Sequence, residues 1–502
     1  MTLTKDSTTH AEPTRYGLVI DGQIVYGPKD DVLERRNPAT GQVVSIYARA
    51  SRYQVDDAVA AARRAFDSGV WSDAAGMTRL RTLTALAGLM REHKGELARL
   101  DSDEGGKPLR VALNDAEGAI GLMEFAASLA AADHGDIHTN LGGDFTGLLV
   151  REPIGVVGAI VPWNFPLLIL CQKVAFALAA GCTVVAKPSE FTSGSALLLA
   201  QLALEAGVPA GVYNVITGEG ATGQALAEHR DVDMITFTGS TATGRHVLEA
   251  SKTNLKKTSL ELGGKAAQIV FADADLDAAV EGVVFGATHN QGECCVAGAR
   301  LLVQAQIADE FDRRLAERAA RLRVGGAEID ADYGAMIHEG HLEKVLNAVE
   351  EAQAQGARVL TGGTRLTDPQ HADGLFVAPT VLADVAPETD AFQNEIFGPV
   401  LTVTKFDTAE EAVNLANGVA YGLANTIWTS SLDTALTVMR KLRSGTVYIN
   451  TTIDGAPQMS FGGYKASGYG REMGRAGFEE FTQLKAVQIR TGNRVGTFGL
   501  RD

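Results

Sequence analysis

The segment NQGECCVAGAR, residues 290–300, places two of the chain's four cysteines side by side. A cysteine thiolate is a strong nucleophile, so Cys294 or Cys295 could carry covalent catalysis. Either could equally be a buried structural thiol, which is the more common use of a free cysteine. Two neighbouring cysteines suit a metal ion poorly and form only a strained disulfide. The residues of this segment leave open which cysteine reacts, and whether either does.

Two other segments carry polar groups in rigid surroundings. Glu261 precedes two glycines in LELGGK, where a carboxylate is either satisfied by the local turn or acts as a general base. Asn164 lies in PWNFP, a segment stiffened by two prolines and two aromatic rings, and its amide can donate two hydrogen bonds. PWNFP could also be a purely structural turn. Glu261 and Asn164 are therefore candidates to assist a reactive thiol, as a general base and as a hydrogen-bond donor.

Two further segments suit a nucleotide. FTGSTATGR, residues 237–245, follows an apolar run and opens a helical one, so its backbone N–H groups could face a diphosphate. It lacks the GxGxxG fingerprint and could be an ordinary turn. Lys187 and Glu190 in KPSE also follow an apolar run and could hold ribose hydroxyls, or form a surface ion pair.

Elements of regular structure must position these residues. Short apolar runs alternate with helical segments, which is typical of an open, mostly parallel sheet with helices on both faces. The rhythm restarts after LELGGK, so we expect two α/β domains in tandem with a joint near Gly263–Gly264, and clefts between domains often hold ligands. The first part of the chain is expected to be helical. The expected helices are 55–66, 77–100, 111–131, 167–180, 193–206 and 275–289, and the expected strands are 155–161, 183–186, 212–216, 234–237, 266–271, 300–303, 377–382, 401–406 and 445–450.

Composition excludes several classes of function. The chain has 502 residues, 45% of them hydrophobic, and a formal net charge of −16, which disfavours nucleic acid and anionic membrane surfaces. No signal peptide and no membrane span are indicated. The cysteines form neither a disulfide ladder nor a zinc set, so we expect no metal site and a reducing, cytoplasmic location.

Taken together, seven segments resemble the aldehyde dehydrogenase superfamily, and the resemblance runs from about residue 36 to residue 472. It identifies the nucleophile as Cys295, because the family pattern is Gly, then Gln or Glu, then any residue, then the reactive Cys. Cys294 then occupies the free position, and a role as a second thiol that traps Cys295 under oxidation is a hypothesis. The seven segments are PWNFP (162–166), KPSE (187–190), FTGST (237–241), LELGGK (260–265), GECC (292–295), EIFGPV (395–400) and FGGYKASGYGRE (461–472).

The resemblance implies a reaction: oxidation of an aldehyde to the carboxylic acid with NAD. Cys295 would attack the aldehyde, and the Asn164 amide and the Cys295 N–H would hold the oxyanion. Glu261 would activate the water that hydrolyses the thioester, and its presence favours hydrolysis over transfer to coenzyme A. A non-catalytic use of the scaffold predicts loss of these groups, and a cysteine acyl hydrolase would need no nicotinamide, so both are remote alternatives.

The resemblance also implies a cofactor site. Lys187 and Glu190 would hold the adenosine ribose, and Glu190 favours NAD moderately over NADP because it repels a 2′-phosphate. The remaining expected contacts are Trp163, Gly239 and Ser240 at the diphosphate, Glu395 at the nicotinamide ribose and Phe397 beside the ring.

By the same resemblance the chain divides into a Rossmann-like cofactor domain, a catalytic domain and a small β arm that joins subunits into a homodimer or homotetramer. The arm would use residues 136–152 and the last stretch, 485–490, and residues 491–502 would be a polar tail. The expected ranges are 1–135 and 153–262 for the cofactor domain, 263–470 for the catalytic domain, and 136–152 and 471–502 for the arm and tail.

The substrate is indicated less sharply. Gln172 stands where many relatives carry Trp, and His289 stands where an aromatic residue is frequent. Asp454 lies in TTIDGAPQMS, which has no aromatic residue and is followed by Phe461. These four tunnel candidates favour a polar or ω-functionalised aldehyde, such as a semialdehyde, amino-aldehyde or hydroxy-aldehyde. The alternative is broad specificity for aliphatic and aromatic aldehydes.

Overall fold

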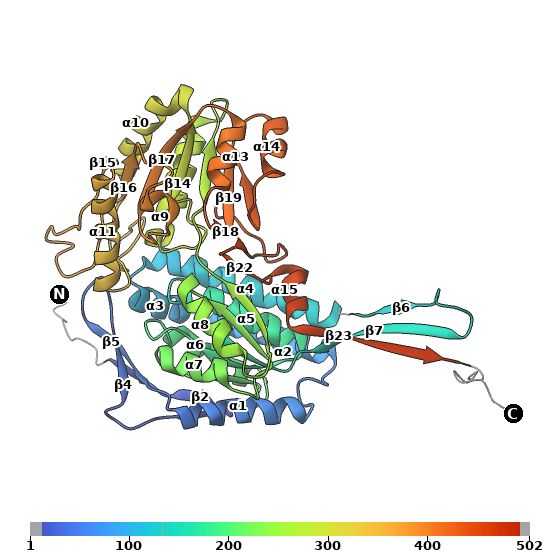
Figure 1. Ribbon diagram of the computed structural model, residues 1–502. Coiled ribbons are helices and arrows are strands. Elements are labelled where there is room, and N and C mark those ends of the chain that lie inside the picture. Colours follow the sequence, from blue (N-terminus) through green and yellow to red (C-terminus); the bar gives the residue numbers. More distant parts are fainter. Residues whose placement is uncertain (1–12, 133, 492–502) are drawn as a thin grey trace, which may run out of the picture.

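Two twisted sheets covered by helices form two lobes, and a long three-stranded arm leaves the lower lobe (Figure 1). The computed structural model describes residues 13–132 and 134–491. The expected residues 491–502 of the tail lie, apart from Thr491, outside the described residues. The mixed α/β fold with mostly parallel open sheets confirms the predicted fold class.

The eight-stranded sheet of the lower lobe has a parallel centre with antiparallel strands at both edges. Its central strands are buried on both faces and read as continuous apolar runs, as parallel strands do. Their order across the sheet is β22 (Gly468–Tyr469), β12 (Lys257–Glu261), β11 (Met234–Thr238), β8 (Val156–Ile160), β9 (Thr183–Lys187), β10 (Tyr213–Val215), β2 (Leu18–Ile20) and β3 (Gln23–Val25).

Helices cover both faces of this sheet. Alternate residues of β8 and β9 belong to different apolar clusters: Val157 and Val184 pack with one set of helices, and Val156 and Val185 with the other. One face carries α1 (Arg52–Asp67), α7 (Gly220–Glu228) and α8 (Thr241–Ser251), and the other carries α2 (Gly76–Glu92), α3 (Lys94–Gly105), α4 (Leu109–Ala132), α5 (Pro166–Ala180) and α6 (Gly194–Glu205).

The upper lobe is built on a seven-stranded sheet that is parallel except for one edge strand. Its order is β15 (Arg358–Thr361), β16 (Thr380–Ala383), β17 (Val400–Phe406), β14 (Arg300–Gln304), β13 (Ala267–Val270), β19 (Ala424–Trp428) and β20 (Thr446–Ile449). Its helices are α9 (Leu276–Thr288), α10 (Ala308–Ala319), α11 (Glu339–Ala354), α12 (Asp390–Gln393), α13 (Ala409–Asn417) and α14 (Leu432–Met439).

The arm consists of β6, β7 and β23 in antiparallel pairing, with β7 in the middle. It brings the expected ranges 136–152 and 485–490 side by side (Figure 1). The bounds of the arm and of the remaining small elements are β6 (Asp136–His138), β7 (Phe145–Pro153), β23 (Thr482–Arg490), β1 (Thr14–Tyr16), β4 (Val32–Arg36), β5 (Val43–Ala48), β18 (Tyr421–Gly422), β21 (Tyr464–Lys465), η1 (His289–Gly292), η2 (Ala305–Ile307) and α15 (Gly474–Glu480).

Three expectations about elements were wrong. The first part of the chain is not helical from its start, because residues 14–48 form five short strands whose patterns are too brief to show a period. The expected helix 77–100 is two helices, α2 and α3, separated at His93. The expected strand 377–382 begins only at Thr380.

The division into domains stays a prediction, and two strand pairings bear on it. The expected joint falls between β12, in the first sheet, and β13, in the second. However, β22 lies within the range expected for the catalytic domain and pairs with β12. The chain therefore returns to the lower lobe at Gly468, before the expected boundary at residue 470.

Among the helices of residues 13–132 and 134–491, none is both long enough and apolar enough to cross a membrane.

Candidate active site

The cysteine segment is held in a tight, strained loop after α9. Asn290 and Gln291 adopt left-handed backbone conformations, with φ of 52° and 56°, which L-residues rarely adopt without support. The support comes from Asn290, whose Nδ2 donates to the carbonyl of Asn164 at 2.9 Å and to that of Glu293 at 3.2 Å. The loop before Cys295 is therefore fixed against the PWNFP segment.

Cys295 is the more accessible of the two thiols. Cys294 is buried, whereas Cys295 is partly exposed. The pKa of Cys295 is raised well above its ordinary value, first by its hydrogen bond with Cys294, then by burial and by the nearby charges of Glu395 and Glu261. The resting thiol is thus protonated, and attack on a carbonyl requires a proton acceptor nearby.

Asn164 lies beneath the cysteine loop. It is buried, and its Nδ2 donates to the carbonyl of Glu293 at 2.9 Å. A side-chain amide carries two N–H groups, so one donor remains beyond this bond. Its Oδ1 has no hydrogen-bond partner among the described residues. Asn164 therefore both anchors the loop and retains a donor beside it.

Glu261 ends strand β12, where the carboxyl ends of the parallel strands meet. It is 2% exposed, and neither of its carboxylate oxygens has a partner among the described residues. Burial raises its pKa well above the ordinary value, and the charge of Glu472 raises it further, against the lowering effect of Lys173. A glutamate with a raised pKa is suited to proton transfer near neutral pH.

The surroundings of Glu261 contain a buried ion pair that the sequence analysis missed. Lys173, fully buried on α5, pairs with Glu472 and also donates to Thr236 Oγ1 at 3.1 Å. A single lysine in the otherwise apolar segment PLLILCQKVAFALAA was the signal for such a pair, because an unpaired buried charge is costly.

A cavity of about 570 Å³ contains Glu261 and Cys295 together with all four tunnel candidates, Gln172, His289, Asp454 and Phe461. His289 stacks on Phe165 with ring centres 5.7 Å apart, and burial lowers its pKa, so the ring is neutral. Gln172 Nε2 lies 3.5 Å from Met473 Sδ.

A second groove, of about 910 Å³, contains five of the seven expected cofactor residues. Lys187 Nζ lies 3.5 Å from a Glu190 carboxylate oxygen at the end of β9, and burial lowers the pKa of Lys187. Ser240 caps α8 by accepting from the Thr243 N–H at 3.1 Å. The five lining residues are Trp163, Lys187, Glu190, Gly239 and Ser240.

Glu395 and Phe397 do not line this groove. Glu395 accepts the N–H of Gly264 at 2.8 Å, and burial raises its pKa to about 7. Phe397 packs edge-on against Trp163 at 5.5 Å, and its carbonyl accepts from His341 Nε2 at 2.7 Å. Phe397 is thus joined to the groove through Trp163, and Glu395 sits beside the joint between the two sheets.

Thr238 connects the two hollows. It ends β11, and it lines both the cavity with Cys295 and the groove with Glu190. Its hydroxyl is buried without a partner among the described residues. In FTGST the glycine and serine were expected to contact the cofactor, and nothing in the motif indicates that Thr238 lines both hollows. A substrate held at Cys295 and a dinucleotide held in the groove would meet at Thr238.

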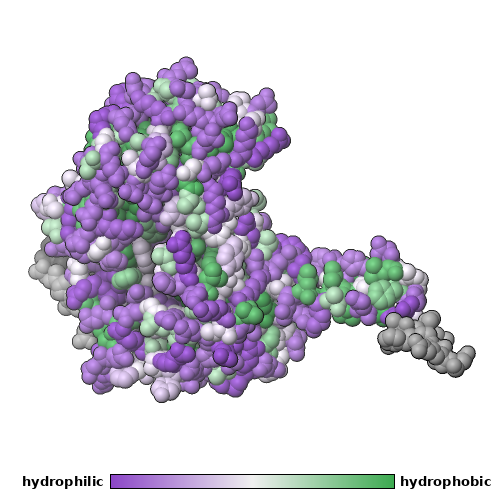
Figure 2. All heavy atoms as spheres, in the orientation of Figure 1, coloured by the Kyte–Doolittle hydropathy of each residue, from purple (hydrophilic) through white to green (hydrophobic). Residues whose placement is uncertain are grey.

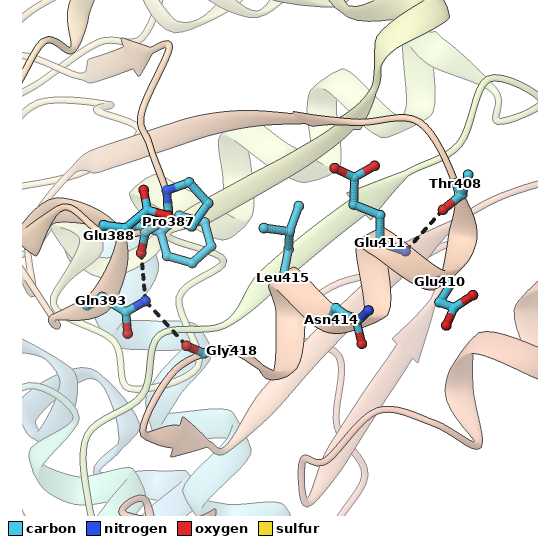
Figure 3. A pocket seen from close by; sticks show the side chains of 10 residues that line it. Pro387, Glu388, Gln393, Thr408, Glu410, Glu411, Asn414, Leu415 and Gly418 are labelled. Atoms are coloured by element: carbon cyan, nitrogen blue, oxygen red, sulfur yellow. Dashed lines mark hydrogen bonds between the residues drawn. The ribbon is translucent and has the colours of Figure 1, made fainter.

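A third hollow lies apart from these residues, on the upper lobe. Figure 3 shows its wall of about ten side chains, with Gln393 on one side and the α13 residues Glu410, Glu411 and Asn414 on the other. It measures about 550 Å³ and contains none of the expected site residues. Most of the expected site residues therefore line the first two hollows, whereas Asn164, Glu395 and Phe397 line neither.

Comparison with known proteins agrees with this site. The sequence pattern of the Aldehyde dehydrogenase family matches residues 26–487. Betaine aldehyde dehydrogenase of Bacillus subtilis is 41% identical over 476 residues, which cover 94% of this chain and 97% of that protein. The crystal structure of an NAD-dependent aldehyde dehydrogenase from Sinorhizobium meliloti is 45% identical, with a TM-score of 0.94 over 97% of this chain and 96% of that one. Betaine aldehyde dehydrogenase of Staphylococcus aureus in complex with NAD+ is 36% identical, with a TM-score of 0.95 over 97% of both chains.

The chain belongs to the aldehyde dehydrogenase family. This membership confirms the resemblance seen in the sequence.

Proposed function

We propose that Cys295 is the nucleophile, Asn164 the oxyanion donor and Glu261 the general base of this enzyme. The observation that carries the proposal is that Cys295 shares one cavity with Glu261, whose carboxylate has no partner among the described residues, and that this cavity adjoins the dinucleotide groove at Thr238. Cys295 and Glu261 both have raised pKa values, so the thiol proton can pass to the carboxylate as sulfur attacks the aldehyde carbon.

The free N–H of Asn164 and the backbone N–H of Cys295 then bind the oxyanion of the tetrahedral adduct. Removing one such donor typically costs about 3 to 4 kcal/mol of barrier. After loss of the hydride the substrate is a thioester on Cys295. Glu261 first releases the thiol proton to cavity water and regains its charge. It then takes a proton from the water that attacks the thioester carbon, and it returns this proton to sulfur as the carboxylic acid leaves, which restores the Cys295 thiol.

The groove residues fit NAD. The buried, unpartnered hydroxyl of Thr238 and the N-terminus of α8 lie in one wall, and both suit the oxygens of a dinucleotide. Lys187 and Glu190 would bind the adenosine ribose, Trp163, Gly239 and Ser240 the diphosphate, and Glu395 and Phe397 the nicotinamide end. When bound, NAD supplies the acceptor for the aldehyde hydride.

The proposed substrate class is a polar or ω-functionalised aldehyde. Gln172, His289 and Asp454 line the cavity, and a relative that is 41% identical is named for a polar substrate, betaine aldehyde. The second candidate is broad specificity for apolar aldehydes, which the apolar side chains Leu168, Ile169 and Val296 in the same cavity favour.

NADH formation with a mixed aldehyde panel tests these proposals, with Cys295→Ala and Cys294→Ala beside the wild type. We expect the wild type and Cys294→Ala to reduce NAD and Cys295→Ala to be inactive. Full activity in Cys295→Ala would overturn the mechanism. A kcat/KM for hexanal or benzaldehyde well above that for short polar aldehydes would overturn the polar substrate class.

We also propose that the arm joins subunits. It presents apolar side chains to solvent, including Ile137 at 69% exposure and Leu484 at 57%, and Figure 2 shows these patches along its length. Exposed apolar strands of this kind usually bind a partner. Sedimentation should show a homodimer or homotetramer, and Ile137→Lys with Leu484→Lys should yield a smaller species.

A cytoplasmic location stays a prediction.

A further inference from the structure

The substrate cavity has an acidic lining. Five carboxylate side chains line it, Asp115, Glu117, Glu261, Asp454 and Glu472, and no lysine or arginine appears among its described lining residues. His289, the one histidine of the lining, is kept neutral by burial. A cavity with this lining repels a negatively charged substrate.

Three of these carboxylates are neutralised by lysines that lie outside the lining. Asp115 pairs with Lys107 at 2.8 Å, and Glu117 pairs with Lys94 at 2.9 Å. Glu472 pairs with the buried Lys173. Their charges are therefore already balanced within the protein.

Asp454 differs from these three. In residues 13–132 and 134–491 it forms no ion pair, and its hydrogen-bond partner is the hydroxyl of Thr451, which donates to Oδ2. Its side chain is exposed, so it stands at the solvent end of the cavity, away from the partly buried Cys295. Tyr448 lines the same cavity, and burial, the two thiols and Asp454 raise the pKa of its hydroxyl.

Aromatic rings and two glycines form part of the cavity lining. Rings of Phe165, Tyr448 and Phe461 line the cavity, and such rings attract cations on their faces. Helix α4 contributes Gly118 and Gly121, one turn apart, where a glycine costs about 1 kcal/mol of helix stability relative to alanine. Both glycines keep side chains out of the cavity and leave room for a bulky group.

We propose that this enzyme selects aldehydes that carry a positive charge at the end remote from the carbonyl, and that Asp454 is the residue that reads this charge. The aldehyde carbon would lie at Cys295, and the cationic group would lie toward the cavity mouth near Asp454. This inference rests on the proposed function and narrows it: within the polar class, ω-ammonium aldehydes are preferred, and anionic semialdehydes are poor substrates.

A pair of substrates with one shape and different charge tests the proposal. 4-(Trimethylammonio)butanal and 5,5-dimethylhexanal differ only by the replacement of N⁺ with carbon. Succinic semialdehyde is the negatively charged substrate for comparison. The readout is kcat/KM by NADH formation with the full-length enzyme, at low and high salt. Because an exposed carboxylate contributes about a twofold to fivefold preference, we expect the cation to be favoured over its isostere by roughly that factor in the wild type.

In Asp454→Asn the cation should lose this advantage while kcat/KM for 5,5-dimethylhexanal stays unchanged, and Asp454→Glu should restore it. Thr451→Val, which removes the hydroxyl partner and keeps the charge, should retain the preference. Glu410→Gln is the matched control, because it deletes one carboxylate from the remote hollow in Figure 3. It should change nothing.

Two results would overturn the proposal. One is a wild type that prefers the neutral isostere or succinic semialdehyde. The other is an Asp454→Asn variant in which kcat/KM falls equally for the cation and its neutral isostere, which would make Asp454 a structural residue. After either result, the uncharged aldehydes show which proposal has failed. If kcat/KM for uncharged hydroxy-aldehydes is still higher than for hexanal and benzaldehyde, only the cation inference fails. If apolar aldehydes exceed every polar one, the proposed substrate class itself fails.

Discussion

Asn164 donates from Nδ2 to the carbonyl of Glu293 at 2.9 Å, and this bond spans 129 residues of sequence. It joins the segment after β8 in the lower lobe to the cysteine loop that leads into the upper lobe. Asn290 doubles the connection by donating to the carbonyl of Asn164. The proposed oxyanion donor and the proposed nucleophile are therefore positioned by the same hydrogen-bonded unit.

Replacing Asn164 with Ala should lower kcat by at least about 100-fold, since it removes an oxyanion donor. Stopped-flow measurement of the first turnover should show the loss in the NADH burst. Asn290→Ala is the control, because it loosens the loop and leaves the Asn164 donor in place. A larger loss in Asn290→Ala than in Asn164→Ala would mean that loop geometry, and not the donor, is the main contribution.

Replacing Cys294 with Ala should make Cys295 more reactive at lower pH. The hydrogen bond with Cys294 is the largest influence that raises the pKa of Cys295, so its removal should lower that pKa. Thiolates alkylate and thiols do not, so the pH profile of iodoacetamide labelling at Cys295 should shift to lower pH. An unchanged profile would assign the raised pKa to burial and to the neighbouring carboxylates.

Replacing Glu261 with Gln should separate the two halves of the reaction. The amide cannot accept a proton from the thiol or from water, so we expect the NADH burst to keep an amplitude of about one equivalent but to form more slowly, and the steady state to be slowed by about 100-fold to 10,000-fold. The test is burst amplitude against steady-state rate. A wild-type steady-state rate in Glu261→Gln would exclude Glu261 as the base.

The pH dependence of the wild-type steady state follows from the raised pKa of Glu261. Only the deprotonated carboxylate works as a base, and a raised pKa means that this form appears at higher pH than for an ordinary glutamate. The hydrolysis rate should therefore be low in acid and rise through neutral into alkaline pH. Glu261→Gln should lose this rise.

The motifs around Cys295, Glu261 and Asn164 could be predicted because each is a short run of residues that is visible without knowing the fold. The structure places Cys295 and Glu261 in one cavity and bonds Asn164 to the loop that carries Cys295, and the roles of all three remain proposals. Contacts between distant residues could not be predicted in this way. Lys173 and Glu472 are 299 residues apart, and Thr238 links two hollows that are formed by separate segments.

The parallel sheets could be predicted from their apolar runs, whereas the edge strands could not. The strands of residues 14–48 are three to six residues long, and their burial patterns differ from the fully buried β2 to the largely exposed β1 and β3, so they share no period that a sequence could show. β22 consists of two residues, Gly468 and Tyr469, and its strand character depends entirely on pairing with β12.

The buried Lys173–Glu472 pair predicts a large loss of stability on removal of one partner. Lys173→Met leaves Glu472, 2% exposed, without its counter-charge, which should cost about 3 to 5 kcal/mol. The double variant Lys173→Met, Glu472→Leu should recover most of this loss. Urea unfolding curves measure both. Lys252→Met, in an exposed pair with Glu249, should change stability little, and an equal loss there would contradict the argument from burial.

The ion pair between Lys187 and Glu190 predicts how cofactor choice could be changed. Glu190 Oε2 lies 3.5 Å from Lys187 Nζ in the wall of the 910 Å³ groove, so the lysine charge is compensated by a carboxylate at the proposed ribose position. In Glu190→Gln the repulsion of a 2′-phosphate disappears and Lys187 becomes free to attract it. We expect the KM for NADP to fall by roughly tenfold, a difference of about 1.4 kcal/mol, while the KM for NAD changes less.

The measurement is kcat/KM for NAD and NADP at a fixed saturating aldehyde, and kcat should stay nearly constant because Glu190 lines the groove whereas Cys295 lines the other cavity. Lys187→Met supplies the complementary variant: it should weaken both cofactors and leave their ratio in favour of NAD, since the carboxylate remains. Glu249→Gln removes a carboxylate elsewhere in the same groove wall and should leave the ratio unchanged. If Glu249→Gln shifts the ratio as far as Glu190→Gln does, the preference arises from the overall negative potential of the groove and not from Glu190.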